Sequence, residues 1–152
     1  MNRERITAEI ETELDAVRRI AQELSAIARD VENGLEPDLR LSTAASGFLQ
    51  SFYNGLEAIF KRFCALHGVP IPSGESFHVE LAKLFDGSEK RLPALLEGDM
   101  WDRLGPYRSF RHVYRQLYSF DLRWDFMAEG VSEAEGVLDE FERRVRVSLH
   151  HH

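Results

Sequence analysis

One apolar stripe runs through the first thirty residues of the chain. Isoleucine, leucine and valine recur there in steps of three or four, which is the repeat of an α-helix with one buried face. The stripe consists of Ile6, Ile10, Leu14, Val17, Ile20, Leu24, Ile27 and Val31. A helix of this length is roughly 45 Å long at about 1.5 Å per residue. Gly34 and Pro37 follow the stripe and are expected to end the helix.

The rest of the chain also reads as helix. Apolar periodicity, capping residues and glycine or proline stops predict further helices at about 38–67, 76–85, 106–119 and after Asp121. Gly130 and Gly136 are points where the last of these helices could break. Residues 88–105 show no clear pattern, and no segment shows the sustained alternation of a half-buried strand. We therefore predict an all-α bundle of four long helices and one or two short ones.

Length and composition indicate one ordinary globular domain. The chain has 152 residues, of which 43% are hydrophobic and 30% are charged. We assign residues 1–148 to this domain and interpret residues 149–152, which end in three histidines, as the remnant of a purification tag. The charged start lacks the apolar stretch of a secretion signal, and no apolar run reaches the roughly 18 residues of a membrane span. Together with the single Cys64, these features predict a cytoplasmic protein without membrane association.

The charge of the chain is distributed unevenly. The net charge is −7, so no global basic field attracts nucleic acid. The segment from Arg103 to Arg123, however, holds five arginines and one acid, a local charge of +4, whereas the remaining residues sum to −11. A confined basic patch is therefore expected.

Within that segment, tyrosine and arginine share one helical face. The stripe consists of Tyr107, Arg111, Tyr114 and Tyr118. Beside it on the helix lie Arg108, His112 and Arg115. Arginine interleaved with tyrosine suits phosphate contact combined with base stacking. In the alternative interpretation, the tyrosines pack inside the bundle and the arginines pair with the acidic first helix.

The sequence of residues 111–118, RHVYRQLY, resembles the HEPN ribonuclease motif. In the HepT toxins of that superfamily the motif is R-x4-H-x-Y, with a polar residue after the arginine. Arg111, His112 and Tyr118 match it, whereas Gln116 stands where the family has histidine. Residues 52–62, FYNGLEAIFKR, also look like the second-helix segment of HepT-like ribonuclease toxins.

This resemblance implies a homodimeric, metal-independent endoribonuclease without a cofactor, whose two motifs form a shared cleft for RNA. For metal-free cleavage the ribose 2′-OH attacks the adjacent phosphate, which requires a proton-transfer group and a cation. Arg111 would supply the cation and, beside it, Arg108, Arg115 and Tyr114 would bind RNA. Gln116 cannot titrate, so either His112 takes over proton transfer or the enzyme is weakened.

The resemblance also implies a protein partner. In the HepT family, a nucleotidyltransferase antitoxin places AMP on the tyrosine that corresponds to Tyr118. Two alternatives remain open at this stage: a non-catalytic HEPN dimer that binds RNA or protein, and a helical scaffold without such a site.

Other histidines carry less weight. His78 lies on a short predicted helix without a companion ligand at metal-binding spacing, so no metal site is expected there. His67 ends the second helix, where an imidazole can meet the last carbonyl groups, and we interpret it as structural.

Overall fold

The computed structural model describes the backbone of residues 2–114 and 122–150 and the side chains of residues 2–112 and 122–150. The described chain is helical and contains no strand. Its helices are α1 (Arg3–Glu32), α2 (Leu39–His67), α3 (Phe77–Lys83), α4 (Met100–Arg103), α5 (Gly105–Tyr114) and α6 (Trp124–His150). The predicted all-α class is confirmed. None of these helices is both long and apolar enough to cross a membrane.

The predicted ranges of α1 and α2 agree with the structure, whereas α3 is shorter than the predicted 76–85 and α4 was not predicted. Three helices are long, with 30, 29 and 27 residues. The described part of α5 has ten residues, and its predicted continuation to Ser119 lies outside the described residues, as does the predicted cap Asp121. Helices α3 and α4 are the short ones.

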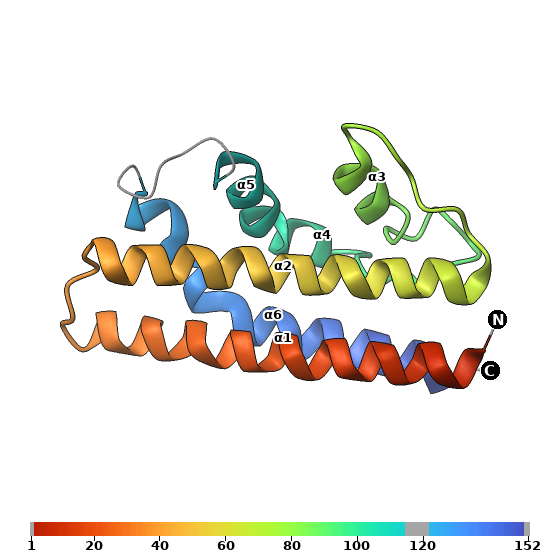
Figure 1. Ribbon diagram of the computed structural model, residues 1–152, viewed down its shortest axis with the longest axis horizontal. Coiled ribbons are helices and arrows are strands. Elements are labelled where there is room, and N and C mark those ends of the chain that lie inside the picture. Colours follow the sequence, from red (N-terminus) through yellow and green to blue (C-terminus); the bar gives the residue numbers. More distant parts are fainter. Residues whose placement is uncertain (1, 115–121, 151–152) are drawn as a thin grey trace.

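The three long helices form the body of the molecule (Figure 1). Helices α1 and α2 run antiparallel, and α6 packs against both of them. The two ends of the chain meet, because Arg3 Nη2 donates a hydrogen bond to the Leu149 carbonyl at 3.0 Å. Helices α3, α4 and α5 lie on the side of α2 away from α1 (Figure 1). Helix α2 contacts α3 and α5 in addition to α1 and α6, and α6 also packs against α4 and α5.

The ends of α1 and α2 follow from local sequence. Asp38 caps α2, since its carboxylate accepts a hydrogen bond from the Leu41 backbone N–H at 2.9 Å. Gly68 ends α2 in the left-handed conformation with φ 67°, which glycine adopts without steric cost. Gly34, with φ 105°, likewise turns the chain away from the helix after the end of α1. The predicted boundaries of both helices are confirmed.

Residues 88–105 complete the core although their sequence has no helical period. Most of this segment is turns, and Leu92, Leu95, Leu96 and Leu104 reach the core from outside any helix, while Met100 does so from the short helix α4. The Leu96 N–H bonds the Phe85 carbonyl at 2.8 Å, which fastens the segment to the end of α3. Because irregular backbone imposes no fixed repeat, periodicity could not detect this part of the core.

Helix α6 differs from the expectation in two respects. Phe126, an aromatic residue in its first turn that apolar periodicity would assign to the buried face, is 62% exposed, and the buried residues start at Met127. Gly130 does not break the helix. A Cβ atom at Gly130 would lie 3.2 Å from Leu49 Cδ2, so this glycine allows α2 to approach α6 closely.

Two glycines of α2 provide a test of this packing. A Cβ atom on Gly55 would overlap Val17 Cγ2 of α1, whereas one on Gly47 would meet nothing within 4 Å. We expect Gly55→Ala to lower the free energy of unfolding by about 1–2 kcal/mol, since overpacking outweighs the gain in helix propensity. Gly47→Ala, the matched control, should raise it by up to about 1 kcal/mol. Urea denaturation measures both values, and equal effects of the two substitutions would contradict close packing at Gly55.

Candidate functional site

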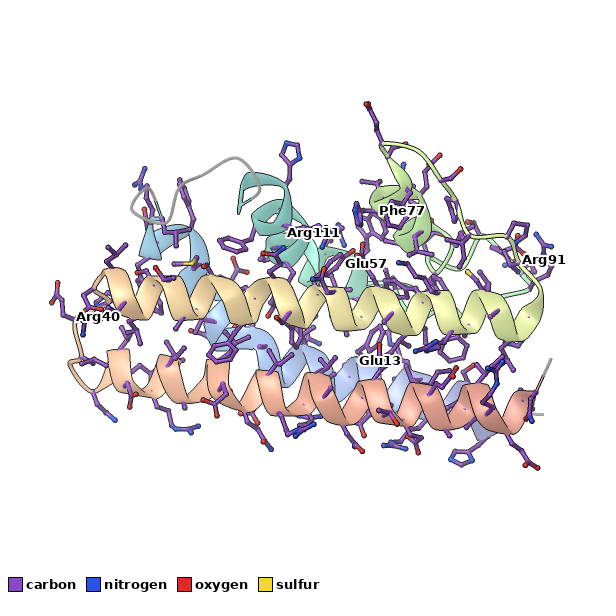
Figure 2. The ribbon with its side chains drawn as sticks, viewed as in Figure 1. Glu13, Arg40, Glu57, Phe77, Arg91 and Arg111 are labelled. Atoms are coloured by element: carbon purple, nitrogen blue, oxygen red, sulfur yellow. The ribbon has the colours of Figure 1, made fainter. Side chains whose placement is uncertain are left out.

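Arg111 lies at the centre of a polar cluster between three helices. From α5, its Nη1 donates a hydrogen bond to the Asn54 side-chain oxygen, and its Nη2 lies 3.0 Å from His78 Nε2. The same Nη1 is 3.8 Å from Glu57 Oε1. Figure 2 shows Arg111 and Glu57 on the side of α2 that faces α3 and α5. We call Asn54, Glu57, His78 and Arg111 the Arg111 cluster.

Glu57 is the buried member of this cluster. It is 4% exposed, and its Oε2 lies 2.7 Å from His78 Nδ1. A buried carboxylate is costly unless it is paired and hydrogen-bonded. Because a carboxylate only accepts hydrogen bonds, Nδ1 of His78 donates, and in a neutral ring Nε2 is left to accept from Arg111. The cluster therefore fixes one tautomer of His78.

A cavity of about 140 Å³ opens beside the Arg111 cluster. Tyr53 of α2 forms one wall, and His78 of α3 forms another. The third wall consists of Arg108, Arg111 and His112 of α5, which are three of the residues predicted from sequence. The fold thus brings the first half of the predicted site to one hollow.

The cavity wall holds polar atoms with no hydrogen-bond partner among the described residues. The Tyr53 hydroxyl and Arg108 Nη1 are both buried and make no hydrogen bond of ordinary geometry there, although the two side chains interact electrostatically with each other. Burial raises the pKa of Tyr53 and lowers the pKa of Arg108, because it disfavours the charged form of each. Unsatisfied buried donors are rare in proteins and are suited to a ligand that supplies acceptors.

Arg108 is held in place through its other nitrogen. Its guanidinium lies over the Trp101 ring, with Cζ 4.1 Å from the ring centroid, and Nη2 donates to the Trp101 carbonyl at 2.8 Å. Stacking on an aromatic face and a backbone acceptor keep the side chain in one orientation. One end of Arg108 is therefore structural, and the other end faces the cavity wall.

Tyr107 is not part of an exposed stripe. It is buried, its ring centroid lies 4.9 Å from that of Phe52, and its hydroxyl donates to the Gly130 carbonyl at 2.8 Å. The interpretation of the tyrosine and arginine stripe as an RNA-binding face is therefore wrong at Tyr107. The alternative, in which the tyrosines pack inside the bundle and the arginines pair with the first helix, is right for Tyr107 but wrong for Arg111, which pairs with Glu57 of α2.

A larger hollow, of about 640 Å³, lies elsewhere, between residues 90–98 and the last turns of α6. Its walls include Arg143 and Arg144, and both of these donate to Glu140. Arg108, Arg111 and His112, the predicted site residues whose side chains the structure describes, do not line it. The smaller cavity, which these three residues line, is therefore the better candidate.

Comparison with protein families identifies the chain. The family model described as HepT-like protein matches residues 44–150. The chain belongs to the HepT-like family of the HEPN superfamily. The match covers most of α2 and all of the elements from α3 to α6, and so both segments that carry the resemblance, residues 52–62 and 111–118. Comparison with curated proteins and with solved structures gives no match.

The second half of the HepT-like motif is outside the described part of the chain. Arg115, Gln116 and Tyr118 lie outside the described residues, and Tyr114 is described only as the last backbone position of α5. Their roles stay predictions. Arg111 and His112 are the motif residues placed at the cavity, with His112 exposed at its rim.

Asn54, Glu57 and His78 were missed as site residues by sequence reasoning. Glu57 had a readable signal, since it is an acid within an apolar stretch of α2, between Leu56 and Ile59. His78 had none, because its partners are 21 and 33 positions away in the chain. The sequence prediction for His78 concerned only metal binding and did not foresee its pairing with Glu57. Among the described side chains, no group of three histidines, cysteines or acids could hold a metal ion.

The pairing of Glu57 can be tested by an isosteric change. Glu57→Gln removes the charge that faces Arg111 and weakens the bond to His78, and we expect it to lower the free energy of unfolding by about 1–3 kcal/mol. The matched control is Glu75→Gln at the exposed rim of the same cavity, where we expect a change within about 0.5 kcal/mol. Urea denaturation compares the two, and equal stabilities would contradict a buried charge pair at Glu57.

Proposed function

We propose that this HepT-like protein is a metal-independent endoribonuclease toxin of a toxin–antitoxin pair. The observation that carries the proposal is the position of Arg111, the motif arginine, which lines a cavity together with Arg108 and His112. The family match, which spans the motif, supports a toxin-like ribonuclease module. We further propose that the protein acts in the cytoplasm and that its substrate is RNA.

The proposed chemistry needs no metal. The ribose 2′-OH attacks the adjacent phosphorus, and negative charge develops on the non-bridging oxygens. Arg111 can bind these oxygens with two parallel N–H donors, and Arg108 Nη1 supplies another donor at the wall. In the free protein the charge of Arg111 is compensated by Glu57, so RNA phosphate has to compete with this carboxylate.

Under the proposed function, the ribonuclease activity of this chain depends on Gln116. An amide side chain can neither give up nor take up a proton at neutral pH, and a positioned general acid or base contributes about 10²–10⁴-fold to rate. We therefore infer that the chain is a weak ribonuclease as written. His112, adjacent to Arg111 and exposed at the cavity rim, is the residue of the motif that can titrate in its place.

We also propose that a nucleotidyltransferase antitoxin neutralises the protein by attaching AMP to Tyr118. The physical reason for inhibition is that a bound adenylate would add negative charge and fill space beside the motif arginine. RNA phosphate would then meet repulsion where the free protein offers a cation.

A non-catalytic HEPN dimer that binds RNA or protein is the second candidate. One observation favours it: the guanidinium of Arg111 is already held by Asn54, Glu57 and His78, which is typical of a structural arginine. In that case Arg108 and Arg115 would contact phosphate without cleavage.

Restoring the motif histidine tests the proposed function. Gln116→His should raise cleavage of RNA in the presence of a chelator by at least about 10²-fold, because it supplies the missing proton-transfer group. The matched variant His112→Ala in the parent sequence shows whether His112 carries the background activity. If the parent, the restored variant and the His112→Ala variant all leave RNA intact, the non-catalytic dimer becomes the better candidate.

The proposed shared cleft requires two copies of the chain. Light scattering at micromolar concentration should give about twice the 17.5 kDa chain mass. Arginine and tyrosine, which the motif supplies, are residue types enriched at the centres of interfaces. A monomer under these conditions would contradict the shared cleft.

A further inference from the structure

We propose that His78 of α3 is a catalytic base of this site, which takes the proton from the attacking ribose 2′-OH. The inference rests on the proposed ribonuclease function and assigns a residue outside the HEPN motif to it. It stands on three observations: the bond of His78 to Glu57, its distance from Arg111, and its place on the cavity wall.

The first observation is the pairing of His78 with a buried carboxylate. Glu57 accepts a hydrogen bond from His78 Nδ1 over 2.7 Å. The carboxylate is only 4% exposed, so water screens its charge little and its neighbours feel that charge strongly. In serine proteases a buried carboxylate orients a histidine in the same manner and stabilises the imidazolium that forms when the histidine takes a proton. Glu57 can do both for His78.

The second observation is that Nε2 of His78 adjoins the phosphate-binding cation. Nε2 lies 3.0 Å from Arg111 Nη2 and accepts its hydrogen bond. A phosphate is a stronger acceptor for a guanidinium than a neutral imidazole is, because both partners are then charged. Binding of RNA phosphate to Arg111 therefore releases Nε2 beside the phosphate, within reach of the neighbouring 2′-OH.

The third observation is access. The side chain of His78 is 25% exposed and lines the same cavity as Arg111 and His112. His112 is next to Arg111 in α5, and adjacent residues of a helix point in different directions. His78 comes from another helix and meets the guanidinium directly, which is the placement that a base beside the phosphate needs.

The proposed step balances as follows. The 2′-O–H proton passes to Nε2 of His78 while the 2′-oxygen forms a bond to phosphorus. The bond from phosphorus to the 5′-oxygen breaks, and this oxygen takes a proton from the general acid or from water. The products are a 2′,3′-cyclic phosphate and a 5′-hydroxyl, and the imidazolium of His78 returns its proton to solvent.

A substrate with an activated leaving group separates the base from the acid. In a nucleoside 3′-(4-nitrophenyl phosphate), the nitrophenolate departs without a proton, so the lack of a histidine at position 116 no longer limits the rate. We expect the parent protein to cleave this substrate. His78→Gln should lower kcat by at least about 10²-fold, and added imidazole should restore part of the rate of His78→Ala.

Two controls accompany this measurement. His67→Gln makes the same chemical change at the end of α2, outside the cavity, and should leave the rate unchanged. Affinity for a short RNA, measured by fluorescence anisotropy, should not be lower for His78→Gln than for the parent, because the proposed role is proton transfer and RNA phosphate displaces His78 from Arg111.

The outcomes distinguish the two proposals. If the parent binds RNA but does not cleave the activated substrate, the ribonuclease function is wrong, and the inference falls with it. If the parent cleaves and His78→Gln cleaves equally fast, only the inference is wrong. If His78→Gln loses affinity along with rate, and imidazole restores nothing to His78→Ala, His78 merely positions Arg111 and the inference is overturned.

Discussion

The carboxylate of Glu57, buried on α2, is the group around which the candidate site is organised. A charge in this position is stable only if other elements supply partners for it. Helix α3 supplies His78 and α5 supplies Arg111, so neutralising one buried acid joins three helices at one point. The cavity lies beside this junction, and its shape depends on the same contacts.

Helix α2 therefore packs into the core with one face and carries residues of the candidate site on the other. One face packs against α1 and α6 and is apolar, with Gly55 allowing the close approach of Val17. The other face carries Tyr53, Asn54 and Glu57 toward α3 and α5. A rigid packed face behind the site keeps the polar groups in place, which favours preorganised electrostatics over a site built on loops.

Electrostatics at the site are closely balanced. The local charge around α5 is positive in a chain of net charge −7, but Glu57 compensates Arg111, and Trp101 engages Arg108. An anion that enters the cavity meets a guanidinium that must exchange partners and a buried Arg108 nitrogen that has no hydrogen-bond partner among the described residues. In the proposed function, such a site would distinguish a well-placed phosphate from diffuse negative charge, since only the former can replace the existing hydrogen bonds.

The sequence by itself determined the helices. The stripe of α1, the Asp38 cap and the Gly68 stop are local signals, and local backbone physics fixes the elements they delimit. It also marked Arg111 and His112 through the motif. Only the tertiary structure decided that Tyr107 belongs to the core, that Phe126 is exposed and that residues 92–104 bury five apolar side chains.

The meeting of His78 with Glu57 and Arg111 is likewise a tertiary property. These residues lie on three helices, and no repeat or spacing within one helix relates them. The apolar repeat along a helix shows which of its faces is buried, but it does not show which residue of another helix packs against that face. That choice follows from how α3 and α5 pack on α2, where a buried charge selects its partners by position and not by sequence distance.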